Sequence, residues 1–559
     1  MGRSDWSNEV IRRSNALAKA GSRRVIATGL PAESARHLSQ GWPDGLLIQV
    51  KSAEEAEIAL KGWVKTPDER MPWGKDNLGV GLLLARRSKK QLQIVDEASP
   101  TTGFVSGGAH LLIVCEQGDE LAQVTSSNLA FALDAAFLVI SELSDQECDD
   151  WMEEIYALDS GPHVSNRFEA ICRRARQRLP SFNFDQFRQI LFVTNGFPWG
   201  VSVPECVTTH MFVYPDLGRS IVEGMWASQE PSRSARNALL IHPQQVTGSE
   251  IEAIAKSLEA NRTLCRIESD QRATVSRVDQ LFDSVPFDII VLSTHAGDVS
   301  GERDTYEFVD SEGHKRRLIV DEAVGFGYDQ KSKKVLVKQF HRFHELDGVS
   351  WVDHAAKKNL YVGTAIQSWV DLGDVAERRK FRVHSEPISR VRGSMALQMH
   401  DNPWMPTVHA FPPSCSPIII NNACSSWHQL SKRLSFAGAR AYVGTLFPVT
   451  EFEAQEVGTA LFRGKPGRSL SKALWETQSA VYGKQWRRPY SMIGLPFCAT
   501  SPNTIDSVAY LRKEYMRAIR DYIHKEQNDE SSEIRENSRR IREFLSEDFK
   551  DFTRVFGEG

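Results

Sequence analysis

Two short stretches decide the fold: FDIIVLSTHAGD, residues 287–298, and PIIINNACSS, residues 417–426. In each of them, an apolar run ends at small and polar residues, which is typical of a strand buried on both faces of a mostly parallel sheet. The first run is followed by His295 and the second by Cys424. Because loops at the carboxyl ends of parallel strands gather at one edge of a sheet, we expect these two side chains to meet there.

The same alternation of short apolar runs and helical stretches extends outward from these strands and predicts an α/β protein. Gly, Ser and Pro punctuation divides the chain into a separate N-terminal α/β domain at residues 1–166 and a second α/β domain at residues 187–500. An insertion at about residues 300–416, rich in charge, Trp and His, interrupts the second domain. Residues 501–559 are charged and amphipathic, and we expect a helical tail there.

Composition limits the classes of function. The chain has 559 residues, of which 41% are hydrophobic and 25% charged, so it can bury a large core and is neither collagen-like nor wholly disordered. Its formal net charge is -4, which provides no global basic field and argues against nucleic acid as a direct partner.

The cysteines and the apolar segments indicate where the protein works. The chain has eight cysteines, and the absence of any C-x-x-C pair argues against a zinc module or a disulfide framework. The longest apolar stretch, residues 129–140, is interrupted by Asp134 and is too short to span a bilayer. No signal-peptide core precedes it. We therefore expect a cytoplasmic protein without a membrane partner.

A cysteine and a histidine within hydrogen-bond reach form a nucleophile and its proton acceptor. The small residues beside Cys424 and His295 would also let backbone N–H groups approach a tetrahedral oxyanion. Spacing alone leaves two other interpretations open. A cysteine after an apolar strand is often a buried small hydrophobe, and a histidine there is often a structural hydrogen-bonding residue.

Three further blocks extend the pattern around these strands. They are NGFPWGVSVPE (195–205), LSFAGARAYVGTLFPVTEFEAQ (434–455) and GRSLSKALWETQSAVYG (467–483). Taken in order with the two strand segments, they resemble the CHAT domain, a group of caspase-like and separase-like cysteine peptidases. The resemblance covers about residues 187–497. It implies a caspase-like, mostly parallel sheet flanked by helices.

The resemblance also assigns roles to residues. It places the catalytic base at His295 and the nucleophile at Cys424, with the backbone N–H groups of Cys424 and Gly297 as oxyanion donors. The chain departs from the family pattern in three ways: the usual His-Gly pair is His-Ala-Gly here, Phe447 replaces a Trp, and the caspase Q-A-C-x-G signature is absent. The long interval between His295 and Cys424 means that the insertion must loop out for the pair to form.

The segment VTE, residues 449–451, resembles the Val-Thr-Asp of separases, in which the acid helps to receive a basic P1 side chain. A carboxylate in a partly dry pocket pairs well with guanidinium. We therefore expect Glu451 in the S1 pocket, with Asp298 as a second candidate. The alternative is that Glu451 only opens a helix, where an acid near the N-terminus is favourable.

Together these features predict a cysteine endopeptidase that cleaves a protein substrate after Arg or Lys. By resemblance it would be a regulated effector in bacterial defence or signalling, with a regulatory protein or activator bound by the N-terminal domain or the C-terminal helices. No cofactor or metal is expected, since the histidines of HRFH (341–344) do not complete a zinc ligand set of standard spacing. The alternative is a catalytically silent scaffold whose N-terminal domain binds a partner or a signalling ligand.

Overall fold

The computed structural model describes residues 12–557. Its gaps fall at residues 29–34, 37–38, 40–41, 43–44, 64–66, 97–102, 159–163, 230–236, 244–248, 330–333, 352, 358–359, 361, 407–409, 464–466, 484, 501–505 and 530. All statements below concern the described residues.

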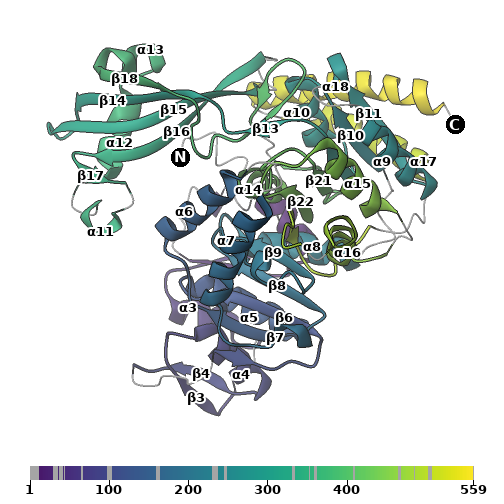
Figure 1. Ribbon diagram of the computed structural model, residues 1–559. Helices are drawn as coiled ribbons and strands as arrows, with labels where there is room; N and C mark the ends of the chain where they lie inside the picture. Colours follow the sequence, from purple (N-terminus) through teal and green to yellow (C-terminus); the bar gives the residue numbers. More distant parts are fainter. Residues whose placement is uncertain are drawn as a thin grey trace.

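One large sheet organises the described part of the chain and contains eleven strands (Figure 1). In their order across the sheet, the strands are β11 (Leu264–Ser269), β10 (Asn237–His242), β12 (Ile289–Leu292), β21 (Ile418–Asn421), β22 (Ala441–Thr445), β23 (Tyr490–Gly494), β9 (Thr208–Phe212), β8 (Gln189–Thr194), β6 (Leu111–Glu116), β7 (Ala136–Ile140) and β5 (Phe104–Val105). Neighbouring strands are parallel, except that β23 runs antiparallel to β22 and β5 antiparallel to β7. The predicted α/β class with a mostly parallel sheet is confirmed.

The two deciding stretches form the centre of this sheet. Every residue of β12 and β21 is buried, as expected for strands covered on both faces. Side chains alternate between the two faces, so Ile290 and Leu292 enter one core and Ile289 and Val291 enter another.

Helices cover both faces of the sheet. One face packs against α6 (Asp145–Tyr156), α7 (Val164–Arg178), α10 (Val275–Ser284) and α14 (His428–Ala437). The other face packs against α9 (Ser249–Ala260), α15 (Glu451–Phe462) and α16 (Leu470–Tyr482) over one half, and against α4 (Leu78–Arg87), α5 (Glu120–Ala132) and α8 (Leu217–Gln229) over the other. This three-layer packing buries the apolar runs that the sequence shows.

The strands do not separate where the sequence predicted a domain boundary. β6 and β7 come from the predicted N-terminal domain, yet β6 pairs in parallel with β8 over Leu111–Cys115 and Gln189–Val193. The strands β5, β6 and β7 are therefore part of the same sheet as the strands that follow them in the sequence. The Gly, Ser and Pro residues taken as a boundary, at residues 159–162, lie outside the described residues.

The insertion forms an antiparallel sheet that projects from the body (Figure 1). Its long strands are β14 (Gly301–Val309), β15 (Lys315–Asp329), β16 (Lys334–Leu346) and β18 (Arg382–Ile388). A small core of its own, around Tyr306 and Trp369 of α12 (Val362–Asp371), holds this sheet. The sequence did not predict these strands, because charged side chains on the exposed positions obscure the two-residue period.

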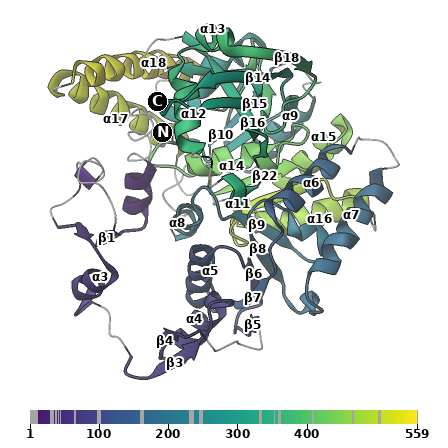
Figure 2. The same ribbon diagram turned by 90° about the vertical axis from the view of Figure 1, so that its left-hand side faces the viewer.

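The C-terminal tail is a pair of helices, α17 (Ser507–Asn528) and α18 (Ser532–Phe556). The apolar side chains of Leu511, Tyr515 and Leu545 are buried in the core that also contains β12 and β21 residues. Figure 2 shows the two helices side by side, and Arg266 of β11 pairs with Asp548 of α18. The helical tail is thus part of the folded body.

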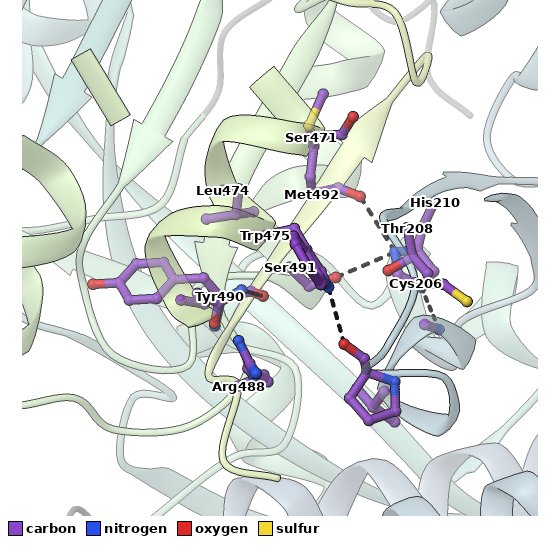
Figure 3. Close-up of a pocket in the computed structure, with 14 residues that line it drawn as sticks. Cys206, Thr208, His210, Ser471, Leu474, Trp475, Arg488, Tyr490, Ser491 and Met492 are labelled. Atoms are coloured by element: carbon purple, nitrogen blue, oxygen red, sulfur yellow. Dashed lines mark hydrogen bonds between the residues drawn. The ribbon is translucent and has the colours of Figure 1, made fainter. Parts of the chain in front are cut away.

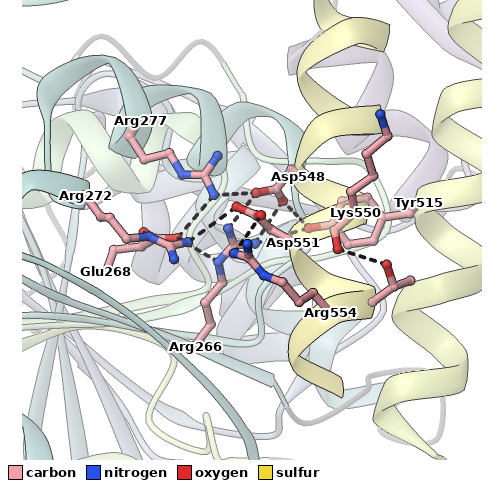
Figure 4. Close-up of polar contacts among 10 residues, drawn as sticks. Arg266, Glu268, Arg272, Arg277, Tyr515, Asp548, Lys550, Asp551 and Arg554 are labelled. Atoms are coloured by element: carbon pink, nitrogen blue, oxygen red, sulfur yellow. Dashed lines mark hydrogen bonds and ion pairs between the residues drawn. The ribbon is translucent and has the colours of Figure 1, made fainter. Parts of the chain in front are cut away.

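A buried polar network fixes this tail to β11 (Figure 4). Asp548 of α18 accepts hydrogen bonds from Arg266 at 2.6 Å and Arg277 at 2.5 Å, and Tyr515 donates to it as well. Although burial opposes ionisation, the hydrogen bonds and positive charges of these arginines lower the pKa of Asp548. Breaking such a network leaves buried charges without partners, which is costly.

Among the residues that the structure describes, no helix combines the length and the apolar character needed to cross a bilayer.

Candidate active site

The two predicted catalytic residues leave the sheet at the same level. β12 and β21 are hydrogen-bonded neighbours in which Leu292 lies opposite Asn421. His295 is three residues beyond Leu292, and Cys424 is three residues beyond Asn421. The strand order thus brings together two residues that are distant in the sequence.

Both residues line one cavity of about 60 Å³, room for a few water molecules. His295 is exposed and Cys424 is partly buried. Glu250 and Glu451 line the same cavity, as does the amide of Asn422. The remaining lining residues are Ser249, Ser293, Thr294, Val449, Thr450 and Ala454. The cavity therefore combines a thiol, an imidazole and two carboxyl groups.

The backbone of His295 is held by the neighbouring strand β19 (Ala396–Gln398). The N–H of Gln398 donates to the carbonyl of His295 at 2.8 Å, and the hydroxyl of Thr294 donates to the carbonyl of Gln398 at 2.5 Å. These bonds fix the segment from which the imidazole projects.

The loop that contains Cys424 is tied to β22. Asn421 accepts a hydrogen bond from the N–H of Ala423 at 3.0 Å, and the hydroxyl of Thr445 donates to the Ala423 carbonyl at 2.8 Å. The hydroxyl of Ser426 donates to the Asn421 carbonyl at 3.1 Å. The loop is therefore fixed on both sides of the cysteine.

Ser425, directly after Cys424, has a φ of 53°, in the left-handed region that non-glycine residues seldom adopt. Strained backbone of this kind persists where the surrounding structure enforces it, and it is common at active sites. The Cys424 Sγ lies 3.9 Å from the carbonyl oxygen of Val449. Burial raises the pKa of the Cys424 thiol, so the protonated form is favoured at neutral pH.

Glu250 is a site residue that the sequence did not reveal. It lies at the start of α9, where an acid is expected simply to complement the helix dipole. Its buried carboxyl accepts hydrogen bonds from the hydroxyl of Ser293, at 2.6 Å, and from the amide of Asn422. Ser293 follows β12 and Asn422 follows β21, so Glu250 links the two loops that bear His295 and Cys424.

The environment of Glu250 is acidic as well as dry. Burial raises the pKa of Glu250, and the negative charge of Glu451 raises it further. Glu250 does not directly follow an apolar strand in the sequence. The one signal that could have predicted it as a site residue is its position in the segment after β10, at the carboxyl end of a parallel strand.

Glu451 is the first residue of α15, so its position also fits the simpler helix-start explanation. However, Thr450 and Glu453 already form a complete capping box at this end of the helix. Arg487 pairs with Glu453. The N-cap therefore does not need the Glu451 side chain, which lines the cavity.

Two predicted site residues do not line the cavity. Gly297 is exposed in β13 (Ala296–Gly297), where it lies opposite Ala396 of β19. Asp298 is paired with Arg390, whose Nε lies 2.9 Å from Asp298 Oδ2, and its side chain is 3% exposed. The geometry thus gives Asp298 a structural partner in place of a basic substrate side chain.

Two described histidines of the insertion, His341 and His344, each lie near a carboxylate, which for His341 is Glu322 Oε1 at 3.7 Å from Nε2. His344 Nε2 lies 2.7 Å from Asp321 Oδ2, and burial lowers the pKa of His341 to about 4. Within the described ranges, the one group of His, Cys, Asp and Glu residues close enough together to hold a metal ion is Asp185, Glu205 and Cys206, and none of the three lines the cavity.

A second cavity lies at the junction of β9 and β23 (Figure 3). His210 spans this junction: its Nε2 accepts the N–H of Gly200 at 2.9 Å, and its Nδ1 lies 3.3 Å from the carbonyl of Met492 and 3.2 Å from the Ser491 hydroxyl. Burial lowers the pKa of His210 to about 4, so it is neutral at physiological pH. This histidine joins the two halves of the sheet.

No family model matches this chain. A search of curated proteins likewise finds no match.

Proposed function

We propose that the protein is a cysteine endopeptidase with Cys424 as the nucleophile and His295 as the general base. The observation that supports this most is their placement at the carboxyl ends of the paired strands β12 and β21, on one cavity. A cysteine that only filled the hydrophobic core would be enclosed by apolar side chains, whereas Cys424 lines a cavity together with a histidine. We also propose, on the resemblance of its sequence, that the chain is a CHAT-family peptidase of the caspase-like and separase-like kind.

The proposed reaction needs no cofactor. His295 accepts the Cys424 proton, and the thiolate attacks the carbonyl carbon of the scissile peptide bond. The tetrahedral intermediate collapses as the imidazolium donates its proton to the leaving amine. The resulting thioester is then hydrolysed by water. Because burial raises the pKa of Cys424, proton transfer to His295 is an essential part of activation.

We propose that the substrate presents Arg or Lys at P1. Glu250 and Glu451 both line the cavity, and a guanidinium or ammonium group between them would relieve their mutual repulsion. The cavity of about 60 Å³ is small for such a side chain, so the segment that contains Val449 and Glu451 would have to move outward when substrate binds.

Proteome-wide mapping of new protein N-termini tests this function. Cells that express the wild type are compared with cells that express Cys424→Ala, and Cys265→Ala serves as the matched control because Cys265 is also partly buried and lies outside the cavity. We expect new N-termini after Arg or Lys with the wild type and with Cys265→Ala. Cleavage after Asp would contradict the basic P1 preference.

The alternative function is a silent scaffold, and one observation favours it: the raised pKa of Cys424 keeps the resting thiol protonated. Identical N-terminal maps for the wild type and Cys424→Ala would support the scaffold.

A further inference from the structure

One arginine joins the segment of His295 to a distant helix. The Nη1 of Arg390 lies 2.8 Å from Glu153 Oε2 on α6, and its Nε lies 2.9 Å from Asp298 Oδ2. A second arginine, Arg392, reaches Glu153 Oε1 at 2.8 Å. Glu153 therefore forms ion pairs with both Arg390 and Arg392, and Arg390 also forms an ion pair with Asp298.

Asp298 depends on this contact. Its side chain is 3% exposed, so a carboxylate at this position needs a cation close by. Burial raises its pKa, while Arg390 acts in the opposite direction. Asp298 is three residues beyond His295, so its ion pair with Arg390 anchors the chain just beyond the segment that presents the imidazole.

The same helix also contacts the segment after Cys424. The ring of Tyr156, on α6, lies 6.4 Å from the ring of His428, the first residue of α14. A methyl group at Gly196 would lie 3.1 Å from the sulfur of Cys148 on α6 and 3.4 Å from Nε2 of His428, so α6 and α14 converge on a residue that has no side chain. α6 is therefore linked to Asp298 through Arg390 and lies close to the first residue of α14.

We propose that Glu153 is a positioning residue for His295, acting through Arg390 and Asp298. This inference rests on the proposed peptidase function. Glu153 does not line the cavity. The ion pairs from Glu153 to Arg390 and from Arg390 to Asp298 fix the position of the His295 side chain relative to Cys424. Small errors in the placement of a general base reduce the rate far more than they reduce substrate binding.

The neighbouring residue provides a matched control. Glu154, on the same helix, pairs with Arg174 of α7 at 2.8 Å and has no link to Asp298. Its side chain is more exposed than that of Glu153, 48% against 22%. Glu154→Gln therefore makes the same chemical change on α6 without touching the proposed connection.

The experiment compares Glu153→Gln with Glu154→Gln in the full chain. On a peptide with Arg at P1, we expect Glu153→Gln to lower kcat about tenfold with little change in KM, and Glu154→Gln to leave both unchanged. Arg390→Met, which keeps the aliphatic stem, should give a similar loss. The double variant Glu153→Gln/Arg390→Met should lose little more, because both substitutions break one connection.

Hydrogen exchange gives a readout that does not depend on catalysis. We expect amides of residues 293–299 to exchange faster in Glu153→Gln than in the wild type or Glu154→Gln. If no peptide is cleaved by the wild type, the peptidase function fails, and the exchange result still decides whether Glu153 positions this segment. Equal exchange and equal kcat in Glu153→Gln and Glu154→Gln would overturn the proposal.

Discussion

The two halves of the large sheet place polar residues at the ends of their parallel strands in different ways. In the half formed by β6 and β8, the strand-end residue Glu116 is 3% exposed and accepts hydrogen bonds from the N–H of Asn195 at 2.5 Å and from Trp199 Nε1 at 2.6 Å. In the half formed by β12 and β21, the strand-end residues His295 and Cys424 open onto a cavity. A strand end is thus a favourable place for chemistry, but only where its groups remain accessible.

Access to the cavity accounts for the difference, because both oxygens of Glu250 accept internal hydrogen bonds as well. Both oxygens of Glu116 have donors, and burial raises its pKa to about 7. Glu116 therefore stabilises the turn after β8 and is closed to ligands. Glu250, in the other half, is buried to a similar degree, but the groups it supports face the cavity.

The largest expected effect is on peptide hydrolysis, in the half of the sheet that contains His295 and Cys424. Cys424→Ala should reduce peptide hydrolysis about a thousandfold or more, because it removes the nucleophile. His295→Ala should be similarly severe, and the double variant should lose little beyond either single one. Steady-state kinetics on an Arg peptide measure this. Full activity of Cys424→Ala would remove the contrast between the two halves.

In the half of the sheet that contains Glu116, the expected effect is on the free energy of unfolding. The carboxyl of Glu116 stays protonated in the folded protein up to about pH 7, whereas in the unfolded chain it ionises near its ordinary pKa of 4.5. Its contribution to stability is therefore full below about pH 4.5 and is lost as the pH rises to about 7, a change of about 3 kcal/mol. Denaturant unfolding of the wild type and Glu116→Gln at pH 5 and pH 7.5 measures it.

Glu116→Gln should remove this pH-dependent difference while Cys424 remains reactive. A Gln variant with the same pH dependence as the wild type would show that another group titrates, and loss of Cys424 reactivity in the folded variant would assign Glu116 to the reaction.

A smaller effect is expected at the rim of the cavity. Glu451→Gln should lower kcat/KM for an Arg peptide by about tenfold, since one charge that faces the substrate cation is lost and Glu250 remains. Because the Thr450–Glu453 capping box is complete without Glu451, the melting temperature should change little. A large fall in the melting temperature with unchanged kcat/KM would favour the helix-start explanation.

The sequence predicted the centre of the fold because β12 and β21 are continuous apolar runs, and it predicted which residues would leave their ends. These features are local or depend on the parallel arrangement alone. Glu451, which lines the cavity, was offered for the S1 pocket by the resemblance to separases, beside the helix-start interpretation.

The remaining features depend on packing that no local pattern records. Glu250 belongs to the site only because α9 covers β12 and β21, and Asp298 is withdrawn from the cavity by Arg390, a residue from the far end of the insertion. The predicted separation at residue 166 was lost because β6 and β8 pair across it. Strand pairing between distant segments is set by the whole sheet, so composition at a turn cannot exclude it.

The most direct measurement is the site of covalent labelling by an arginyl chloromethyl ketone, determined by mass spectrometry on the intact chain. We predict modification of Cys424, at a rate that His295→Ala lowers about a hundredfold, with Cys148 and Cys265 unlabelled. Labelling that is spread over these partly buried cysteines, or a Cys424 rate that His295→Ala leaves unchanged, would contradict a Cys424–His295 active site.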